Sequence, residues 1–272
     1  MILMTGTELA NNIKEGLSAE VATFSHAPKL VVIQVGDNEA SAKYIRMKQK
    51  ACERVGIIFE HVHFEEKTLE SDIINKIFGL NNDQNVNGII VQLPLPNGFN
   101  TDRILESIEP IKDVDGLTIV NRDLLANADI GLYPATAEGV INLLRYYNVP
   151  MKGALAVVLG RSNLVGKPVV TLLAAEGANV TVCHSQTTDT RAKTLKADII
   201  VSAVGKRNLL TAEMVKKGAA VIDVGMDVDF DGVSKVAGYL TPAIGGVGPM
   251  TVAMLLSNVV KAAKMQNTPP SS

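Results

Sequence analysis

The stretch "VVLGRSNLVGKPVVTLLAAEG", Val157 to Gly177, decides the fold of this 272-residue chain. Its apolar start is typical of a buried strand, and its end is rich in residues that favour a helix. Between the two lies a turn that contains Gly160 and Gly166, followed by a proline in the first helical turn, where a missing N–H costs no hydrogen bond. A strand that enters a helix through a glycine turn is typical of α/β domains that bind nucleotides, although such turns also occur for geometry alone.

The residues around this turn continue the alternation of strands and helices. Segments of these lengths in this order predict a parallel sheet covered by helices. Residues 139–251 are therefore expected to form a doubly wound, Rossmann-like lobe. Its strands are expected over residues 154–159, 179–183, 198–202 and 220–224, and its helices over 139–147, 167–176, 191–196 and 212–217.

The first half of the chain has an alternation of its own, which is interrupted by a long loop-rich segment over residues 97–139. Loops of that length are usually functional or flexible. A last helix over 248–266 is expected to return to the first lobe, and residues 267–272 are expected to be a loose tail. The strands of this half are expected over 29–36, 57–64 and 86–94, and its helices over 9–24, 40–56 and 69–80.

The fold class is therefore predicted as α/β with two lobes and a cleft between them. Residues 1–138 plus 252–272 are expected to form an N-terminal α/β catalytic lobe. Residues 139–251 are expected to form the nucleotide-binding lobe, which has the doubly wound pattern.

Composition excludes several classes of protein. A formal charge of −2 argues against a broad nucleic-acid surface, and 4% aromatic residues without tryptophan argue against a stacking platform for single strands. Cys52 and Cys183 lie far apart, so neither a disulfide framework nor a metal site is expected. The chain has no run of roughly 18 apolar residues and no signal-peptide pattern, so no membrane association and a cytoplasmic location are expected.

The strand after the glycine turn bears on which nucleotide is bound. NAD-binding folds usually carry an acidic residue near the end of this strand, where it holds the ribose hydroxyl. Here His184 and Ser185 stand at that place, and Arg161 lies in the turn. A serine and an arginine suit a 2′-phosphate, which a carboxylate would repel. NADP is therefore preferred over NAD, unless Arg161 and Ser185 only interact with water at the surface.

Four polar residues of the first lobe are candidates for chemistry. Tyr44 and Lys48 are four residues apart and share one face of a helix. The same spacing occurs in short-chain dehydrogenases, but there the pair follows the nucleotide loop, and here it precedes that loop. Gln92 ends a buried strand at the edge where parallel sheets bind ligands. Asp115 belongs to "KDVDG", which alone is equally typical of a turn. An exposed lysine beside a half-buried tyrosine is the simpler interpretation of the pair.

Taken together, these stretches resemble one family. The order of "YIRMKQKACERVGI", "GIIVQLPLP", "KDVDGL", "GRSNLVGKP", "TVCHSQT" and "GGVGPMTVAMLL" is similar to that in bifunctional methylenetetrahydrofolate dehydrogenase/cyclohydrolases. The resemblance runs from about residue 36 to the C-terminal helix. It implies an enzyme of one-carbon metabolism that oxidises 5,10-methylenetetrahydrofolate with NADP and hydrolyses the 5,10-methenyl product to 10-formyltetrahydrofolate. It also implies a homodimer that is paired through the nucleotide lobe.

The resemblance also implies roles for residues. Lys48 is expected to be the central catalytic residue, with Tyr44 and Gln92 around it. Asp115 is expected to hold the pterin ring of the substrate. The NADP site is expected to comprise Gly160, Arg161, Ser162, Gly166, Ser185, Val204, Gly205 and Thr251.

The sequence departs from the family pattern in two places. "PATAEG", residues 134–139, has Ala135 and Ala137 where the pattern has cysteine and proline. "TPAIGGVG", residues 241–248, has Ala243 and Ile244 at altered positions. Neither change removes a residue with an expected chemical role, so the expected reaction stands while substrate affinity and lobe closure become less predictable.

Two other functions fit parts of the sequence. A monofunctional NADP-dependent dehydrogenase would have lost hydrolysis, which the presence of Lys48 and Gln92 argues against. A non-catalytic nucleotide-binding module leaves all four polar residues of the first lobe unexplained. His61 and His63 alternate on one strand as a metal pair would, but no third ligand lies nearby in the sequence, and a half-exposed strand accounts for them.

Overall fold

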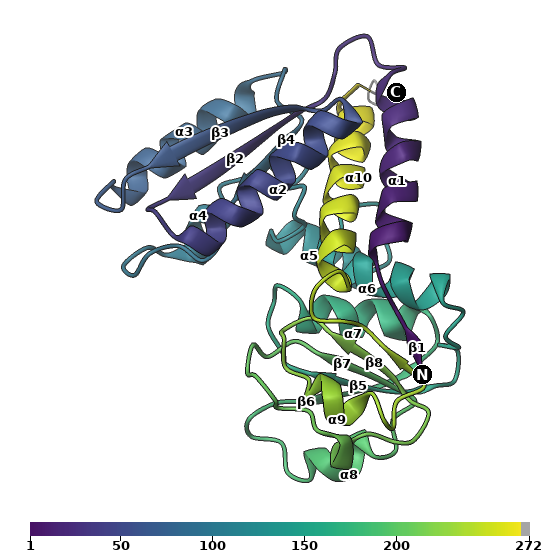
Figure 1. Cartoon of the computed structure of the whole chain (residues 1–272). Coiled ribbons are helices and arrows are strands. Elements are labelled where there is room, and N and C mark those ends of the chain that lie inside the picture. Colours follow the sequence, from purple (N-terminus) through teal and green to yellow (C-terminus); the bar gives the residue numbers. More distant parts are fainter. Residues whose placement is uncertain (268–272) are drawn as a thin grey trace. The chain divides into compact units, whose positions relative to one another are not determined.

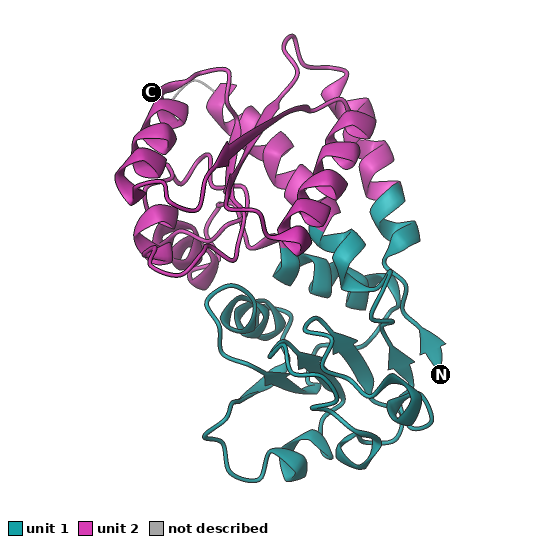
Figure 2. Cartoon of the chain, turned by 60° about the vertical axis from the view of Figure 1, so that its left-hand side comes forward, with its two compact units in different colours: residues 1–11, 136–251 teal, residues 12–135, 252–272 magenta. Residues whose placement is uncertain are grey.

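The computed structural model describes residues 1–267, and the chain divides into two compact units (Figures 1 and 2). Unit 1 consists of Met1–Asn11 and Thr136–Thr251, and unit 2 consists of Asn12–Ala135 and the chain from Val252 onward. Two helices, α1 (Thr7–Val21) and α10 (Val247–Asn267), run across the boundary between the units. The α/β fold class predicted from the sequence is confirmed, and most of the expected tail lies outside the described residues.

Unit 1 contains a sheet of six parallel strands in the order β6-β5-β7-β8-β9-β1. The chain passes from β5 to β6 on one side and then returns to place β7 on the other side of β5. The order therefore reverses between β5 and β7, and ligands of open α/β sheets bind beyond the carboxyl ends of the strands at such a switch point. The strands are β1 (Ile2–Leu3), β5 (Leu155–Leu159), β6 (Asn179–Cys183), β7 (Ile199–Ser202), β8 (Ala220–Asp223) and β9 (Tyr239–Leu240).

The first residues of the chain belong to unit 1, whereas the sequence had placed them in the first lobe. Strand β1 pairs with β9, and the amide of Ile2 donates to the carbonyl of Gly238 at 2.7 Å. The amide of Thr5 donates to the hydroxyl of Tyr147 at 3.0 Å. A strand of two residues has no hydrophobic period to detect, so β1 and β9 were both missed.

The helices of unit 1 agree with the expected ones except near residue 212. There the expected helix of six residues is a single 3₁₀ turn, η1 (Ala212–Met214), and a four-residue helix, α9, was not expected. Lysines and a glycine follow η1, and the chain turns at once into β8. The helices are α6 (Ala135–Tyr146), α7 (Gly166–Ala175), α8 (Thr190–Thr194) and α9 (Phe230–Val233).

Unit 2 contains three parallel strands in the order β3-β2-β4, with a switch point between β2 and β4. The helix that follows β2 is α2, which the side chain of Asn38 caps at its start and Gly56 ends with a left-handed φ of 89°. Its buried face consists of residues three or four apart, which is the period of a helix. The elements are β2 (Lys29–Val35), α2 (Glu39–Val55), β3 (Ile58–Phe64), α3 (Glu70–Asn82) and β4 (Gly88–Val91).

The long segment expected to be loop-rich contains two short helices, α4 (Thr101–Leu105) and α5 (Ile119–Ala126). Asn100 and Thr118 cap them with their side chains. The buried Asn258 of α10 donates to the carbonyls of residues 114 and 133 at 2.9 and 2.8 Å, so α10 holds the middle and the later part of this segment. The rest of the segment up to Pro134 is irregular, as expected, and the two short helices were not predicted.

Each unit has its own apolar core. In unit 2, Val31 and Ile33 of β2 and Ile89 of β4 pack with Ile73 and Ile77 of α3, all with no exposed surface. In unit 1, a second cluster gathers residues from β5, β7, β8 and β9. Among residues 1–267, no helix is long and apolar enough to cross a membrane.

Candidate functional site

Lys48 and Gln92 meet at the switch point of the unit 2 sheet. Lys48 lies on the buried face of α2, and its side chain is 9% exposed. Gln92 follows β4 directly, where its amide donates to the carbonyl of Ile33 at 2.8 Å. The Lys48 Nζ donates to the Gln92 Oε1 at 3.1 Å, and the Gln92 Nε2 donates to the carbonyl of Leu93 at 2.8 Å. The side chain of Gln92, which is fixed by its bond to the backbone, therefore fixes the position of the Lys48 amine.

The charge of Asp115 acts on this lysine. Burial lowers the pKa of Lys48 from its usual value near 10.5, and the negative charge of Asp115 raises it in the opposite sense. Burial raises the pKa of Asp115, and the positive charge of Lys48 lowers it. Loss of solvation thus favours the neutral forms of both groups, while their mutual attraction favours the charged forms.

Asp115 has its position because the backbone around it is fixed. The amide of Ile89 in β4 donates to the carbonyl of Lys112 at 2.8 Å, so the segment runs alongside that strand. The buried carboxylate of Asp113 accepts from the amide and hydroxyl of Thr118, each at 2.8 Å, and from the side chain of Asn121 at 2.9 Å. The "KDVDG" motif is therefore a fixed buried turn as well as the carrier of Asp115.

Tyr44 and Ser41 lie on α2 before Lys48. Tyr44 is 46% exposed, one helical turn from the lysine, which leaves its ring free to contact a ligand of unit 2. Ser41 is buried, and its hydroxyl has no hydrogen-bond partner among the described residues. Ser41 stands on the same buried face as Lys48. Sequence analysis missed it, because a serine on the buried face of a helix is common in proteins of any function.

In unit 1, the glycine turn lies at the switch point between β5 and β7. Gly160 has a φ of +111°, and a Cβ atom there would lie 2.5 Å from the carbonyl oxygen of Ala203, which follows β7. A Cβ atom at Gly166 would lie 2.6 Å from the carbonyl oxygen of Gly160. The two glycines thus let three backbone segments approach closely, which leaves a cradle without side chains at the start of α7.

The polar residues expected around this cradle all face solvent. Ser162 accepts from the amides of Val165 and Gly166 at 3.2 and 3.3 Å, so its side chain ties the turn to the start of α7. The guanidinium of Arg161 donates to the Gln186 side chain at 3.3 Å, which brings it to the loop that bears the exposed Ser185. The geometry therefore suits an anion on the β6 side of the turn.

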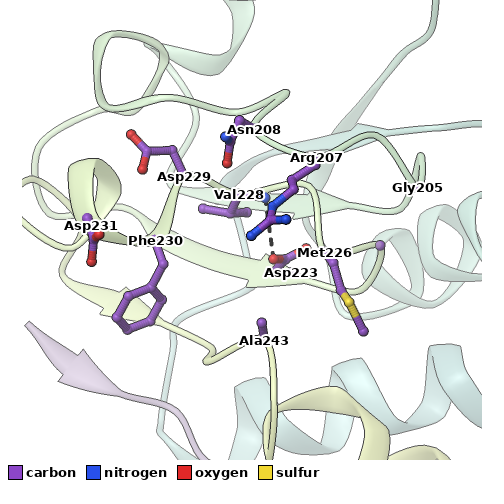
Figure 3. A pocket seen from close by; sticks show the side chains of 11 residues that line it. Gly205, Arg207, Asn208, Asp223, Met226, Val228, Asp229, Phe230, Asp231 and Ala243 are labelled. Atoms are coloured by element: carbon purple, nitrogen blue, oxygen red, sulfur yellow. Dashed lines mark hydrogen bonds between the residues drawn. The ribbon is translucent and has the colours of Figure 1, made fainter.

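The loop after β7 contains two further predicted residues, Val204 and Gly205, and both are exposed. Gly205 also lines a pocket of about 780 Å³ within unit 1. Figure 3 shows this pocket, with Asp223 at the end of β8 and Met226 just beyond it. Burial raises the pKa of Asp223, although hydrogen bonds from the amides of Asp227 and Val228 lower it.

Thr251 lies in α10, where its hydroxyl donates to the hydroxyl of Thr136 at 3.3 Å. Thr136 belongs to the altered "PATAEG" segment, whose Ala135 and Ala137 are buried at the start of α6. The other altered segment carries Ile244, which is 88% exposed, an unusual state for an isoleucine. Nothing in the structure of unit 1 explains that exposure.

The remaining candidates have structural partners. His63 lies 3.1 Å from a carboxylate oxygen of Asp37, and burial together with His63 lowers the pKa of His61. Burial raises the pKa of Cys52 to about 12 and also raises that of Cys183, so both thiols are poor nucleophiles. Within residues 1–267, no three His, Cys, Asp or Glu side chains form a group that would hold a metal ion.

Two parts of the chain match models of known protein domains. Residues 4–115 match the family "Tetrahydrofolate dehydrogenase/cyclohydrolase, catalytic domain", and residues 134–267 match "Tetrahydrofolate dehydrogenase/cyclohydrolase, NAD(P)-binding domain". The "Bifunctional protein FolD" of Paracidovorax citrulli is 45% identical over 96% of this chain and 97% of its own length. That of Paraburkholderia phytofirmans is 46% identical over 97% of each chain.

Solved structures are similar over the same range. The bifunctional FolD enzyme of Campylobacter jejuni has a TM-score of 0.94 and 44% identity, covering 97% of this chain and 99% of its own. The Trypanosoma brucei methylenetetrahydrofolate dehydrogenase-cyclohydrolase, solved with NADP cofactor and an inhibitor, has a TM-score of 0.93 and 36% identity, covering 97% and 98%.

Proposed function

Because the chain belongs to the tetrahydrofolate dehydrogenase/cyclohydrolase family, we propose that it oxidises 5,10-methylenetetrahydrofolate with NADP and hydrolyses the 5,10-methenyl product to 10-formyltetrahydrofolate. The observation that carries the proposal is the buried Lys48, hydrogen-bonded to Gln92, with the charge of Asp115 acting on it. Unit 2 would carry the folate chemistry, and unit 1, to which residues 1–11 belong as well, would bind NADP.

The cradle at the glycine turn fits the cofactor. Gly160 and Gly166 keep the turn free of side chains, so that a pyrophosphate can approach the backbone closely, and Arg161 and Ser185 lie where a 2′-phosphate would need partners. Val204, Gly205 and Thr251 are proposed to contact the nicotinamide half. Bound NADP accepts a hydride from the substrate, and the protein contributes binding and orientation to that reaction.

Lys48 has a different importance for the two reactions. Oxidation leaves a cation delocalised over two nitrogens and a carbon of the folate. A charged amine 4 Å from that cation would cost roughly 4 kcal/mol at an effective dielectric constant near 20. A neutral amine avoids this cost, and burial already lowers the pKa of Lys48 in that direction. The oxidation thus needs Lys48 to be neutral but does not need it as a reacting group.

Hydrolysis does need the amine. Water attacks the cationic carbon and loses a proton, and one ring nitrogen of the folate gains a proton as it leaves. Neutral Lys48 accepts the first proton and then supplies it to the departing nitrogen, and the hydroxyl of the intermediate releases the second proton to water as the formyl carbonyl forms. Gln92 orients the amine through the bond at its Oε1, and Tyr44 is placed to pack against the substrate. Asp115 is proposed to accept hydrogen bonds from the pterin N–H groups.

A spectrophotometric assay tests this function directly. NADPH formation and methenyl absorbance are followed together after methylenetetrahydrofolate and NADP are added. We expect NADPH to accumulate and the methenyl signal to stay low because hydrolysis removes it. A persistent methenyl signal would indicate the monofunctional dehydrogenase, and absence of NADPH would indicate a nucleotide-binding module without this activity.

The pH dependence of hydrolysis tests the coupling between Lys48 and Asp115. Because the neutral amine is the base, kcat/KM for hydrolysis is expected to rise with pH through the lowered pKa of Lys48. Asp115 raises that pKa, so Asp115→Asn lowers it further and moves the rise to lower pH. The exposed Asp123 of α5 supplies the control variant, Asp123→Asn, whose profile should match the original. A rise that stays in place in Asp115→Asn contradicts the coupling.

We further propose a cytoplasmic homodimer that acts on a small folate and binds no nucleic acid. In support, β6 is an edge strand of the unit 1 sheet and has exposed residues, so its backbone is open to pairing with a second copy. The formal charge of −2 gives no general attraction for phosphate backbones. Sedimentation velocity at micromolar concentration tests the dimer, and a monomer there contradicts it.

A further inference from the structure

The loop that follows β7 is held by a buried carboxylate to which the proposed reaction gives no role. Asp227 lies four residues after the end of β8 and has no exposed surface. Its Oδ2 accepts from the Ser202 hydroxyl at 2.7 Å and from the amide of Val204 at 2.8 Å. Its Oδ1 accepts from the amide of Lys206 at 2.5 Å. One side chain thus binds the end of β7 and two alternate amides of the loop.

The residues around Asp227 allow the carboxylate to approach the loop after β7 closely. A Cβ atom at Gly225 would lie 2.6 Å from the Asp227 Oδ2 and 2.7 Å from the amide nitrogen of Gly205, so only glycine lets the two loops meet. The amide of Asp227 donates to the Asp223 Oδ1 at 2.8 Å, which holds the backbone of Asp227 to the end of β8. The backbone from which the Asp227 carboxylate extends is therefore fixed in position.

The other side of the same loop faces the glycine turn. The carbonyl of Ala203 is the group that a Cβ atom at Gly160 would strike. The loop from Ala203 to Lys206 is thus held between the turn after β5 and the carboxylate that comes from beyond β8. This is the switch point of the sheet, where a dinucleotide crosses from the β6 side to the β8 side.

Accordingly, we propose that Asp227 is a positioning residue, which sets the conformation of residues 203–206 and through it the seat of the nicotinamide half of NADP. This inference rests on the proposed NADP-dependent function. Asp227 has no role in seating the adenine half, because that half lies on the β6 side of the switch point, where Arg161 and Ser185 stand.

The shape-conserving variant Asp227→Asn tests the inference. An amide has one acceptor atom, so its NH₂ group must face one of the three donors and lose that hydrogen bond. Loss of a hydrogen bond to a charged group corresponds to a factor of roughly 10 or more. We therefore expect the Kd for NADP to rise about tenfold. The Kd for adenosine 2′,5′-bisphosphate, which lacks the nicotinamide half, should stay within about twofold of the original, less than the effect of one hydrogen bond.

Calorimetric titration of both ligands into the full-length protein gives the readout. Glu213→Gln, on the exposed turn η1, is the control for loss of one negative charge and should leave both Kd values unchanged. The hydrolysis rate of Asp227→Asn should equal the original rate, because hydrolysis uses unit 2 residues.

Each remaining outcome contradicts a stated claim. Equal Kd values for NADP in Asp227→Asn and the original protein would overturn the positioning role. Parallel weakening of both ligands would also overturn it, since it would show a general loss of structure in unit 1. Failure of the original protein to bind NADP while binding the bisphosphate normally would instead overturn the proposed function, and the inference with it.

Discussion

Replacing Lys48 by methionine is expected to reduce the rate of methenyl hydrolysis by a factor of about 10² to 10⁴, the usual contribution of a general acid–base group. The dehydrogenase rate should fall far less. Methionine is close to lysine in length and apolar, so it fills the buried position on α2 without the amine. Oxidation requires only that no positive charge opposes the forming cation, and the variant meets that requirement.

The two activities are measured on the same preparation, by NADPH formation and by decay of methenyl absorbance with the uncatalysed decay subtracted. Lys50→Met is the matched control, because Lys50 lies on the same helix with its side chain exposed. It should retain both rates. Equal losses of oxidation and hydrolysis in Lys48→Met would contradict the division of roles between the two reactions.

Replacing Gly160 by alanine is expected to have the opposite effect, in which the dehydrogenase activity falls and hydrolysis is retained. The new Cβ would lie 2.5 Å from the carbonyl oxygen of Ala203, and the φ of +111° is unfavourable for alanine. The two atoms nearest to the new Cβ, the carbonyl oxygen and carbon of Ala203, belong to the backbone. The Cβ therefore fits only if the glycine turn and the loop after β7 move apart. A misplacement of about 1 Å can cost roughly 100-fold in rate, so dehydrogenase kcat/KM for NADP should fall between 10- and 100-fold.

Hydrolysis by Gly160→Ala should stay near the original rate, because Lys48, Gln92 and Asp115 all belong to unit 2. Gly153→Ala is the control. Gly153 also has a positive φ, +77°, but a Cβ atom there meets nothing within 4 Å. Gly153→Ala should therefore lose about 1–2 kcal/mol of stability from the left-handed backbone conformation, but its Cβ collides with no other atom. If both glycine variants lose dehydrogenase activity equally, close approach to Ala203 is not the reason for the glycine.

Together the two variants separate the reactions by unit. Lys48→Met should oxidise without hydrolysing, and Gly160→Ala should hydrolyse supplied methenyltetrahydrofolate without oxidising efficiently. The separation is a consequence of the chain's arrangement, because the residues proposed for each step have their hydrogen bonds within one unit.

Much of the fold was predictable from local patterns. The apolar runs of β2, β4, β5 and β7 and the helical period of α2 were confirmed within a few residues at their ends. These elements are long enough, or buried enough, for the period of their side chains to be read directly. Gln92 was placed correctly at the end of a strand because β4 is fully buried and prolines follow it.

Other features could not be predicted from local sequence patterns. Strands β1 and β9 have two residues each, and their pairing joins the start of the chain to residue 239. Helices α4 and α5 are short, and the side chains of Asn100 and Thr118 cap them. Ser41 and Asp227 gave no clear signal, since a buried serine on a helix and an aspartate after a strand are common in proteins of any function.

The sequence by itself determined the α/β class, the two series of strands and helices, and the family, because each depends on patterns between near neighbours or on motifs in order. Tertiary structure alone decided that the Lys48 amine meets Gln92, 44 residues away, and that Asp227 holds the loop after β7. Both contacts lie where neighbouring parallel strands end, β2 and β4 for Gln92 and β7 and β8 for Asp227. The hydrogen bonds of a parallel sheet, which local patterns do not specify, set which strands those are.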